Sequence, residues 1–320
     1  MLRILTFHRV VNPEEIPDFD PKLVSARPDV FEKQMQYLAK NYNVVSMHDV
    51  LASFESKLPL PGKSVLITFD DAYTDFIDIA WPILKKYHLP ATMFVPTGFP
   101  DDHAKCFWWD KLFRALRHTR NTSLKHPRIN AEDLDQADKK FALFLKLRNI
   151  TKGLEHKGAM LFVDEVCQLL GYVHKPFKSV MSWNELKKLA REGLSLGAHT
   201  RNHPVMTRLS NSEIRAEIHH SLHDLAENIG SNLPIFCYPA GGYNNEVARI
   251  LQDEGVQLAF TTRDGHNDLK TVDPYSLRRT NITQKSSPFI FRMRLTRWFS
   301  YLDAYRHKGD RALVGADETK

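Results

Sequence analysis

The stretch VLITFDD, residues 65–71, is an apolar run that ends in two adjacent carboxylates. The run is too short for a helix and predicts a buried β-strand. Two like charges held at one strand end disfavour ionisation unless a cation lies beside them, so a bound metal dication would explain Asp70 and Asp71. The same pair could also serve simply as a helix N-cap. The stretch therefore predicts a strand and leaves the role of its acids open.

Five further apolar runs have the same length and character, and most of them end in polar or glycine-rich residues: Ile4–Phe7, Thr92–Val95, Leu194–Ala198, Ile235–Tyr238 and Leu258–Thr261. Amphipathic helical patterns lie between the strands: Asp29–Asn41, Phe76–Tyr87, Trp183–Glu192, Asn211–Ile229 and Glu246–Glu254. This alternation predicts an α/β fold with a parallel sheet, either open or closed into a barrel. In both forms the ligand site lies at the C-terminal ends of the strands.

One segment, residues 101–179, breaks the alternation because it is basic and shows helical patterns without a strand pattern. We interpret it as a helical insertion after the third strand. Such an insertion either adds packing to the barrel wall or forms a lid or substrate-binding subdomain. We therefore predict a barrel over residues 1–286 with this insertion, followed at 287–320 by an amphipathic helix and a polar tail.

Composition narrows the class of protein only broadly. The 320 residues are 42% hydrophobic and 26% charged, which is typical of a folded globular chain. The formal net charge of +6 is compatible with nucleic acid, acidic glycans or an anionic membrane as partners. No nucleic-acid recognition motif is present, so we expect no nucleic-acid partner. The three cysteines lie far apart and indicate no disulfide framework.

A second polar motif, HTRNHP at residues 199–204, directly follows another predicted strand. Histidines at i and i+4 lie on one side of a helical turn, so His199 and His203 could both bind one ion. Alone, such a pair can be purely structural. Two imidazoles with one carboxylate, however, leave coordination positions open for water and substrate, as a hydrolytic metal requires.

With these two motifs in this order, the sequence resembles the polysaccharide deacetylase family, carbohydrate esterase family 4, also called the nodulation-type chitooligosaccharide deacetylase homology domain. The resemblance covers about residues 2–282, apart from the insertion. It implies a distorted (β/α) barrel and the hydrolytic removal of an N-acetyl group from an N-acetylated saccharide or glycan intermediate.

The resemblance also implies roles for the motif residues. Asp71, His199 and His203 would bind a divalent metal, and Asp70 would act as the catalytic base. We expect Zn²⁺, although Co²⁺, Ni²⁺ and Mn²⁺ suit the same ligands.

A third family motif is altered here, in the stretch CYPAGGY at residues 237–243. Cys237 stands where the family has an arginine that orients the catalytic aspartate, and Ala240 stands where it has an aromatic residue. The Ala240 N–H could still stabilise an oxyanion, because a main-chain donor needs only the turn. Arg278 or Arg279 could supply the missing guanidinium next to Asp70.

The general acid and the substrate contacts are less well defined. The family uses a late histidine as the acid, and His266 is the nearest match, although its flanking residues differ from the family pattern. His8, at the end of the first strand, is a second candidate, as the acid or as a substrate contact, or else it is a histidine that only bonds the backbone. Candidate substrate contacts are Tyr243, Arg279 and Trp108.

Two functional alternatives stay open on the sequence alone. One is a metal-dependent hydrolase of a non-sugar amide, and the other is a catalytically inactive glycan-binding protein. The N-terminus lacks a secretory signal pattern, so we expect a cytoplasmic protein, with its substrate handled inside the cell. Residues 287–306 interleave aromatic residues with arginines, which predicts either peripheral contact with the inner face of the membrane or a terminal helix packed on the barrel.

Overall fold

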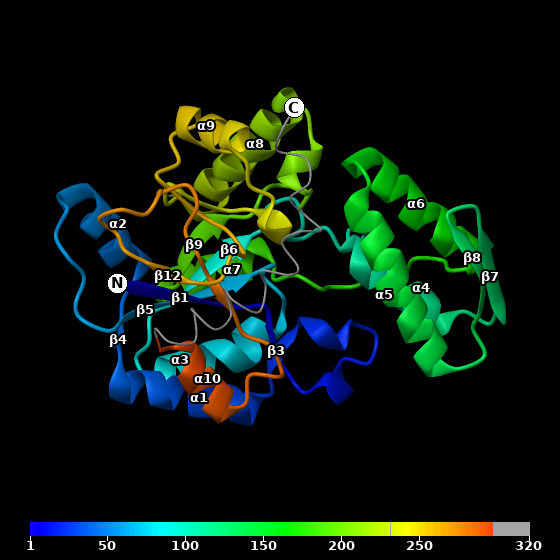
Figure 1. Ribbon diagram of the computed structural model, residues 1–320, viewed down its shortest axis with the longest axis horizontal. Helices are drawn as coiled ribbons and strands as arrows, with labels where there is room; N and C mark the ends of the chain where they lie inside the picture. The colour runs from blue at the N-terminus through cyan, green and yellow to red at the C-terminus, as the bar shows by residue number, and fades with distance from the viewer. Residues whose placement is uncertain (231, 297–320) are drawn as a thin grey trace.

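The computed structural model describes residues 1–230 and 232–296, and its centre is one curled sheet (Figure 1). Six parallel strands follow the spatial order β11-β10-β9-β6-β5-β1, and β12 continues the sheet antiparallel to β1. All six predicted strands are present, with small shifts at their ends. Their bounds, with that of β12, are β1 Leu2–Phe7, β5 Ser64–Asp70, β6 Thr92–Val95, β9 Ser195–Ala198, β10 Ile235–Cys237, β11 Leu258–Phe260 and β12 His266–Asn267.

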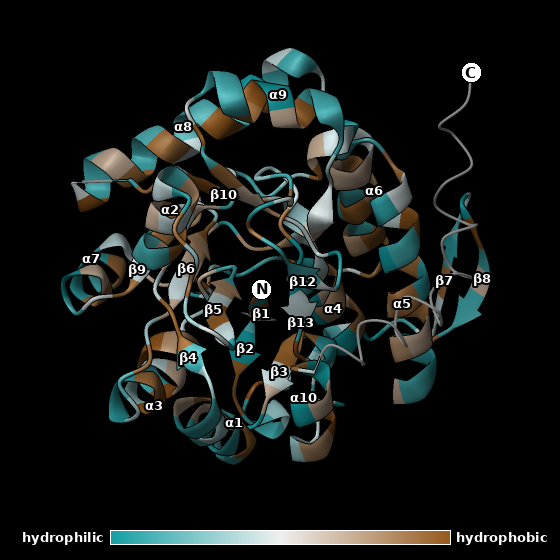
Figure 2. Ribbon diagram, turned by 60° about the vertical axis from the view of Figure 1, so that its left-hand side comes forward, coloured by the Kyte–Doolittle hydropathy of each residue, from teal (hydrophilic) through white to brown (hydrophobic). Residues whose placement is uncertain are grey.

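The helices surround this sheet in a ring, as Figure 2 shows, so the predicted distorted (β/α) barrel is confirmed. The five predicted helical patterns correspond to α1 Pro28–Asn41, η3 Phe76–Ala80 with α3 Trp81–Lys86, α7 Trp183–Arg191, α8 Asn211–Ile229 and α9 Asn245–Asp253. A further helix, α2 Met47–Ser56, was not predicted, although Ser46 and Asp49 form a capping box at its start.

Strand β5 explains why residues 65–71 are so apolar. Every residue of β5 is buried, because helices cover one face of the sheet and the barrel interior covers the other. Alternate side chains therefore join different clusters: Ile67 and Phe69 pack with the residues of α1, whereas Leu66 packs with Phe94 inside the barrel. The run ends at Asp70 because there the strand reaches the polar end of the barrel.

A last short strand, β13 Thr280–Asn281, adds parallel to β1, with Leu5 opposite Thr280. The chain has returned across the barrel to reach this place. Residues just before β13 therefore lie beside the C-terminal end of β5, although about two hundred positions separate them in sequence.

The insertion forms a lobe beside the barrel (Figure 1). The described lobe contains three helices, and also an antiparallel hairpin that the sequence pattern did not predict. The hairpin strands are short and mostly exposed, so they carry little of the apolar alternation that marks a strand. The lobe has its own hydrophobic cluster and consists of α4 Trp108–His118, β7 Ser123–His126, β8 Ile129–Asp133, α5 Ala137–Gly153 and α6 His156–Leu169.

The described part of the C-terminal segment packs on the barrel. Helix α10, Pro288–Arg294, lies against α1 and buries Phe291, whereas Phe289 is 72% exposed. The rest of the segment predicted to contact a membrane, residues 297–306, lies outside the described residues. Among residues 1–230 and 232–296, no helix is both long enough and apolar enough to cross a bilayer.

Candidate active site

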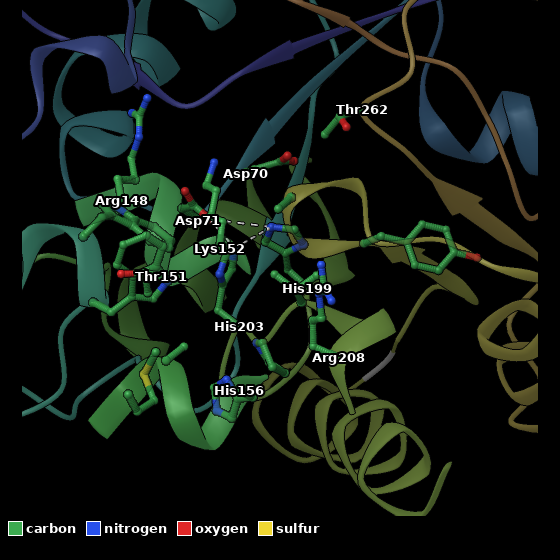
Figure 3. Close-up of a pocket in the computed structure, with 18 of the residues that line it drawn as sticks. Asp70, Asp71, Arg148, Thr151, Lys152, His156, His199, His203, Arg208 and Thr262 are labelled. Atoms are coloured by element: carbon green, nitrogen blue, oxygen red, sulfur yellow. Dashed lines mark hydrogen bonds and ion pairs between the residues drawn. The ribbon is translucent and has the colours of Figure 1, made fainter. Parts of the chain in front are cut away.

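A pocket opens at the C-terminal ends of β1, β5, β9 and β10, where the fold predicts the ligand site (Figure 3). The barrel contributes both acids and both histidines of the two motifs. The insertion contributes the opposite wall from α4, α5 and α6. Other lining residues used below are His8, Asp20, Trp108, Trp109, Arg148, Lys152, Arg208 and Ala240.

Three acceptor atoms converge in this pocket. The Oδ1 atom of Asp71 lies 3.2 Å from His203 Nε2 and 3.5 Å from His199 Nε2, and the two Nε2 atoms are 3.2 Å apart. Asp71 Oδ1 is buried and accepts no hydrogen bond from the described residues. A cation between the three atoms would satisfy all of them, so the predicted ligand set is brought together and fits a divalent metal.

The tautomer of His199 also fits this role. Its Nδ1 lies 2.7 Å from the carbonyl oxygen of Cys237, which can only accept a hydrogen bond. Nδ1 must therefore carry the proton, and in the neutral ring the lone pair of Nε2 points at Asp71. A backbone carbonyl that orients a histidine in this way is typical of metal sites.

The backbone of the histidine motif differs from our prediction. Residues 199–204 form no helical turn, and Thr200 (φ 63°) and His203 (φ 58°) adopt left-handed conformations. The loop is held by Thr200 Oγ1, which accepts from His203 N–H at 2.9 Å, and by Glu217 of α8, which accepts from the two backbone N–H groups of residues 201 and 202. Strained backbone that neighbours hold in place is common where side chains must meet at a functional site.

An arginine, Arg279, holds the carboxylate of Asp70. We predicted this role for Arg278 or Arg279. Arg279 Nη1 and Nη2 donate to the two carboxylate oxygens at 2.8 and 2.7 Å, and both side chains are almost completely buried. Burial opposes ionisation of Asp70, but the Arg279 charge and its hydrogen bonds outweigh it and hold the pKa of Asp70 below its ordinary value. Arg278 points elsewhere and donates to the Asp264 carbonyl.

Arg279 thus occupies space that the small side chain of Cys237 does not fill. Its Nη2 lies 3.0 Å from Cys237 Sγ, so the small cysteine leaves room for a guanidinium that arrives from another strand. Because Arg279 is 1% exposed, the prediction that it contacts substrate is wrong.

The two candidates for the general acid are at opposite ends of β1. His8 directly follows β1 and lines the pocket. His266 lies on β12, where it is opposite Arg3, and both of its ring nitrogens are within 3.0 Å of the Arg3 guanidinium. The prediction of His266 as a catalytic residue is wrong, because β12 runs antiparallel to β1 and places it at the far end of the strand.

Ala240 lines the pocket with φ 53°, in the short turn that follows β10. Among the described residues its N–H donates to no acceptor. This position leaves the Ala240 N–H available as a donor to a ligand in the pocket.

Of the two aromatic residues predicted to contact substrate, one lines the pocket and the other does not. Trp108 lines the pocket. Tyr243 does not, because its hydroxyl donates to Asp273 at 3.0 Å and its ring packs against Tyr238. The loop after β10 turns Tyr243 outward, and this prediction is wrong.

Trp109 packs on a candidate metal ligand, a role that the sequence did not predict. Its ring lies 5.0 Å from the His203 ring in an edge-to-face arrangement, and its Nε1 donates to Tyr73 Oη at 3.1 Å. Tyr73 in turn belongs to the loop that carries Asp71. The adjacent pair of tryptophans at 108–109 was the available signal, but nothing in the sequence links it to His203.

Replacing Trp109 with leucine is expected to weaken metal affinity about tenfold or more, because it frees the His203 ring and the Tyr73 hydroxyl. The measurement is a competitive titration with a chromogenic chelator. Trp108→Leu, which removes the neighbouring indole but keeps the Trp109 ring that contacts His203, is the matched control. Equal affinity of both variants for the metal would contradict this role for Trp109.

Comparisons with known proteins identify the family of this chain. The sequence profile described as polysaccharide deacetylase matches residues 57–259. The protein YxkH of Bacillus subtilis (strain 168) is 22% identical over 262 residues, which are 82% of this chain and 67% of that protein. The poly-beta-1,6-N-acetyl-D-glucosamine N-deacetylase of Staphylococcus epidermidis is 33% identical over 103 residues, 29% of this chain and about a third (35%) of that enzyme.

A solved structure shows the same fold. The Streptococcus pyogenes deacetylase PplD in complex with acetate superposes with a TM-score of 0.62 at 22% identity, over 92% of this chain and 98% of that one. The profile match spans more than half of the sequence and contains the acid pair, the histidine motif and the altered third motif. On this match, which the shared barrel supports, the chain belongs to the polysaccharide deacetylase family.

Proposed function

We propose that this protein is a divalent-metal-dependent hydrolase that removes the acetyl group from an N-acetylated saccharide. The observation that carries the proposal is the meeting, in one pocket, of three metal-type acceptors with a carboxylate clamped by an arginine. Asp71, His199 and His203 would hold the ion, with Zn²⁺ favoured by two imidazoles and one carboxylate and Co²⁺, Ni²⁺ or Mn²⁺ as alternatives. When bound, such an ion polarises a carbonyl and acidifies water.

Asp70 would act as the base. Its low pKa keeps it ionised near neutral pH, so it can accept a proton from the attacking water. Arg279 holds both oxygens of Asp70, and it thereby fixes the orientation of the carboxylate toward the pocket. The Ala240 N–H would donate to the carbonyl oxygen as negative charge develops there.

His8 would act as the acid. An amine is a poor leaving group until it is protonated, so some residue must supply a proton after the attack. His8 lines the pocket together with Asp70 and Asp71, whereas His266 lies outside it. The name of the staphylococcal relative, an N-deacetylase of an N-acetylglucosamine polymer, supports a saccharide substrate. Trp108 offers an aromatic surface in the same pocket on which a sugar ring can stack.

The test is acetate release from a panel of N-acetylated sugars, free and lipid-linked, and of non-sugar N-acetyl amides. The panel is given to metal-reconstituted wild type beside Asp70→Asn and His199→Ala. We expect release by the wild type that is lost in both variants. Release only from non-sugar amides would favour the amide hydrolase. Saccharide binding without release from any compound would favour a glycan-binding protein.

His8→Ala is expected to lower kcat by roughly 10²–10⁴, because the leaving amine loses its proton donor. His266→Ala is the matched control and should keep the wild-type kcat, since that ring contacts Arg3 at the far end of β1. The measurement is kcat for acetate release, with thermal unfolding to verify the fold. Equal losses in both variants would contradict the assignment of His8.

A further inference from the structure

The wall that the insertion adds to the pocket is basic. Helix α5 contributes Arg148 and Lys152, and Arg208 follows the histidine motif on the barrel side. Figure 3 draws these three side chains around the carboxylates and histidines of the site. Because they line the same pocket as Asp70 and Asp71, they are available to contact a ligand bound there.

Of these three cationic side chains, only Arg148 has an anionic partner among the described residues. Arg148 Nη1 pairs with Asp20 Oδ2 at 3.1 Å. Within residues 1–230 and 232–296, Lys152 and Arg208 form no ion pair and no side-chain hydrogen bond. In that part of the chain they are therefore two cationic groups of the pocket without an anionic partner.

The acids of the pocket do not neutralise them. Asp70 is neutralised by Arg279, and Asp20 by Arg148. Asp71 lies beside the two histidines. A divalent cation bound there would more than neutralise the single negative charge of Asp71. Desolvation in the cleft lowers the pKa of Lys152, and the charge of the neighbouring Arg148 lowers it further. An anion that enters the pocket would lower the repulsion between these positive charges.

We infer that the pocket accepts an N-acetylated saccharide that carries a negative charge near the acetylated sugar. The inference rests on the proposed function and adds the charge of the substrate. The anionic group is a carboxylate, as in a uronic acid, or a phosphate, and Lys152 and Arg208 bind it by charge-assisted hydrogen bonds. Trp108 meanwhile supplies an apolar surface for the uncharged part of the saccharide.

The test compares oligosaccharides that share the N-acetylated sugar and differ in charge: neutral, with a neighbouring uronate, and with a phosphate. We expect the wild type to have the highest kcat/KM on a charged oligomer, and the uronate and phosphate arms identify which group it is. Each of K152Q and R208Q should lower the ratio of kcat/KM for that oligomer to kcat/KM for the neutral one about tenfold. Added salt should lower the same ratio in the wild type.

K157Q is the control, because Lys157 is an exposed lysine of α6 that does not line the pocket. It removes one positive charge and should keep the wild-type ratio. A wild type that prefers the neutral oligomer, or a ratio that is unchanged in K152Q and R208Q, would overturn the inference while leaving the proposed deacetylation intact.

Binding separates the two hypotheses when activity fails. If the wild type releases no acetate from any oligomer, the proposed function fails, but Trp108 and Trp109 still report binding by their fluorescence. Tighter binding of a charged oligomer than of the neutral one, weakened in K152Q and R208Q, would then support the anionic ligand. Equal binding of all three oligomers would overturn it.

Discussion

Arg279→Gln is expected to lower kcat roughly a hundredfold or more, because Asp70 loses the clamp that orients both of its oxygens. It should also destabilise the fold by about 3–5 kcal/mol, since the substitution leaves a buried carboxylate without its cation. The measurements are kcat for acetate release and the free energy of unfolding in urea. Arg278→Gln is the matched control, because Arg278 is exposed and its side chain bonds a backbone carbonyl.

A double-mutant cycle sharpens this prediction. Asp70→Asn removes the base and should lower kcat by roughly 10²–10⁴. The double variant Asp70→Asn/Arg279→Gln should be more stable than the sum of the two single losses implies, because no buried charge then lacks a partner. It should remain inactive. An Arg279→Gln variant with wild-type stability and kcat would contradict the clamp.

The same pair predicts a pH dependence of stability. The pKa of Asp70 is lower in the folded state than in the unfolded chain, so the ionised carboxylate favours folding. This contribution is fully present above the unfolded pKa of about 3.9 and is lost as the pH falls through the folded pKa. The stabilities of the wild type and of Asp70→Asn, measured by urea unfolding across this pH range, should therefore differ at neutral pH and converge in acid.

Asp71→Asn and His199→Ala are each expected to reduce bound metal well below one ion per chain and to lower kcat by roughly 10³ or more. Each removes one of three converging ligands, and the ion supplies several kcal/mol of transition-state stabilisation. The measurements are elemental analysis of the purified protein and acetate release before and after chelation. Restored activity when Zn²⁺ is added back to the chelated wild type completes the test.

The control is His223→Ala on α8. His223, Asp224 and Glu227 are a second group that could hold an ion, but they lie on the surface away from the pocket. This variant should keep both the metal content and the activity of the wild type. Full activity of the thoroughly chelated wild type would contradict the metal-dependent mechanism.

The sequence alone determined which segments form strands and helices. It also determined that the candidate functional residues lie at the C-terminal ends of the strands. Apolar runs of strand length that alternate with amphipathic helices leave few choices besides a parallel sheet covered by helices. Polar residues placed directly after such strands must meet at one end of the barrel. For this reason residues 65–71 and 199–204 predicted the acid pair and the histidine pair as neighbours, and both lie in one pocket.

Only the tertiary structure decided which of the distant residues join them. Arg278 and Arg279 are adjacent in sequence, but side chains on an extended chain alternate, so only Arg279 faces Asp70. His8 and His266 both flank strands, and the antiparallel course of β12 sends His266 to the wrong end of β1. Lys152 reaches the site because a separate lobe packs beside the barrel, whereas Arg208 comes from the barrel itself. Periodicity records which face of a local element is buried, but such contacts depend on how elements far apart in the chain are placed together, and no local pattern encodes that placement.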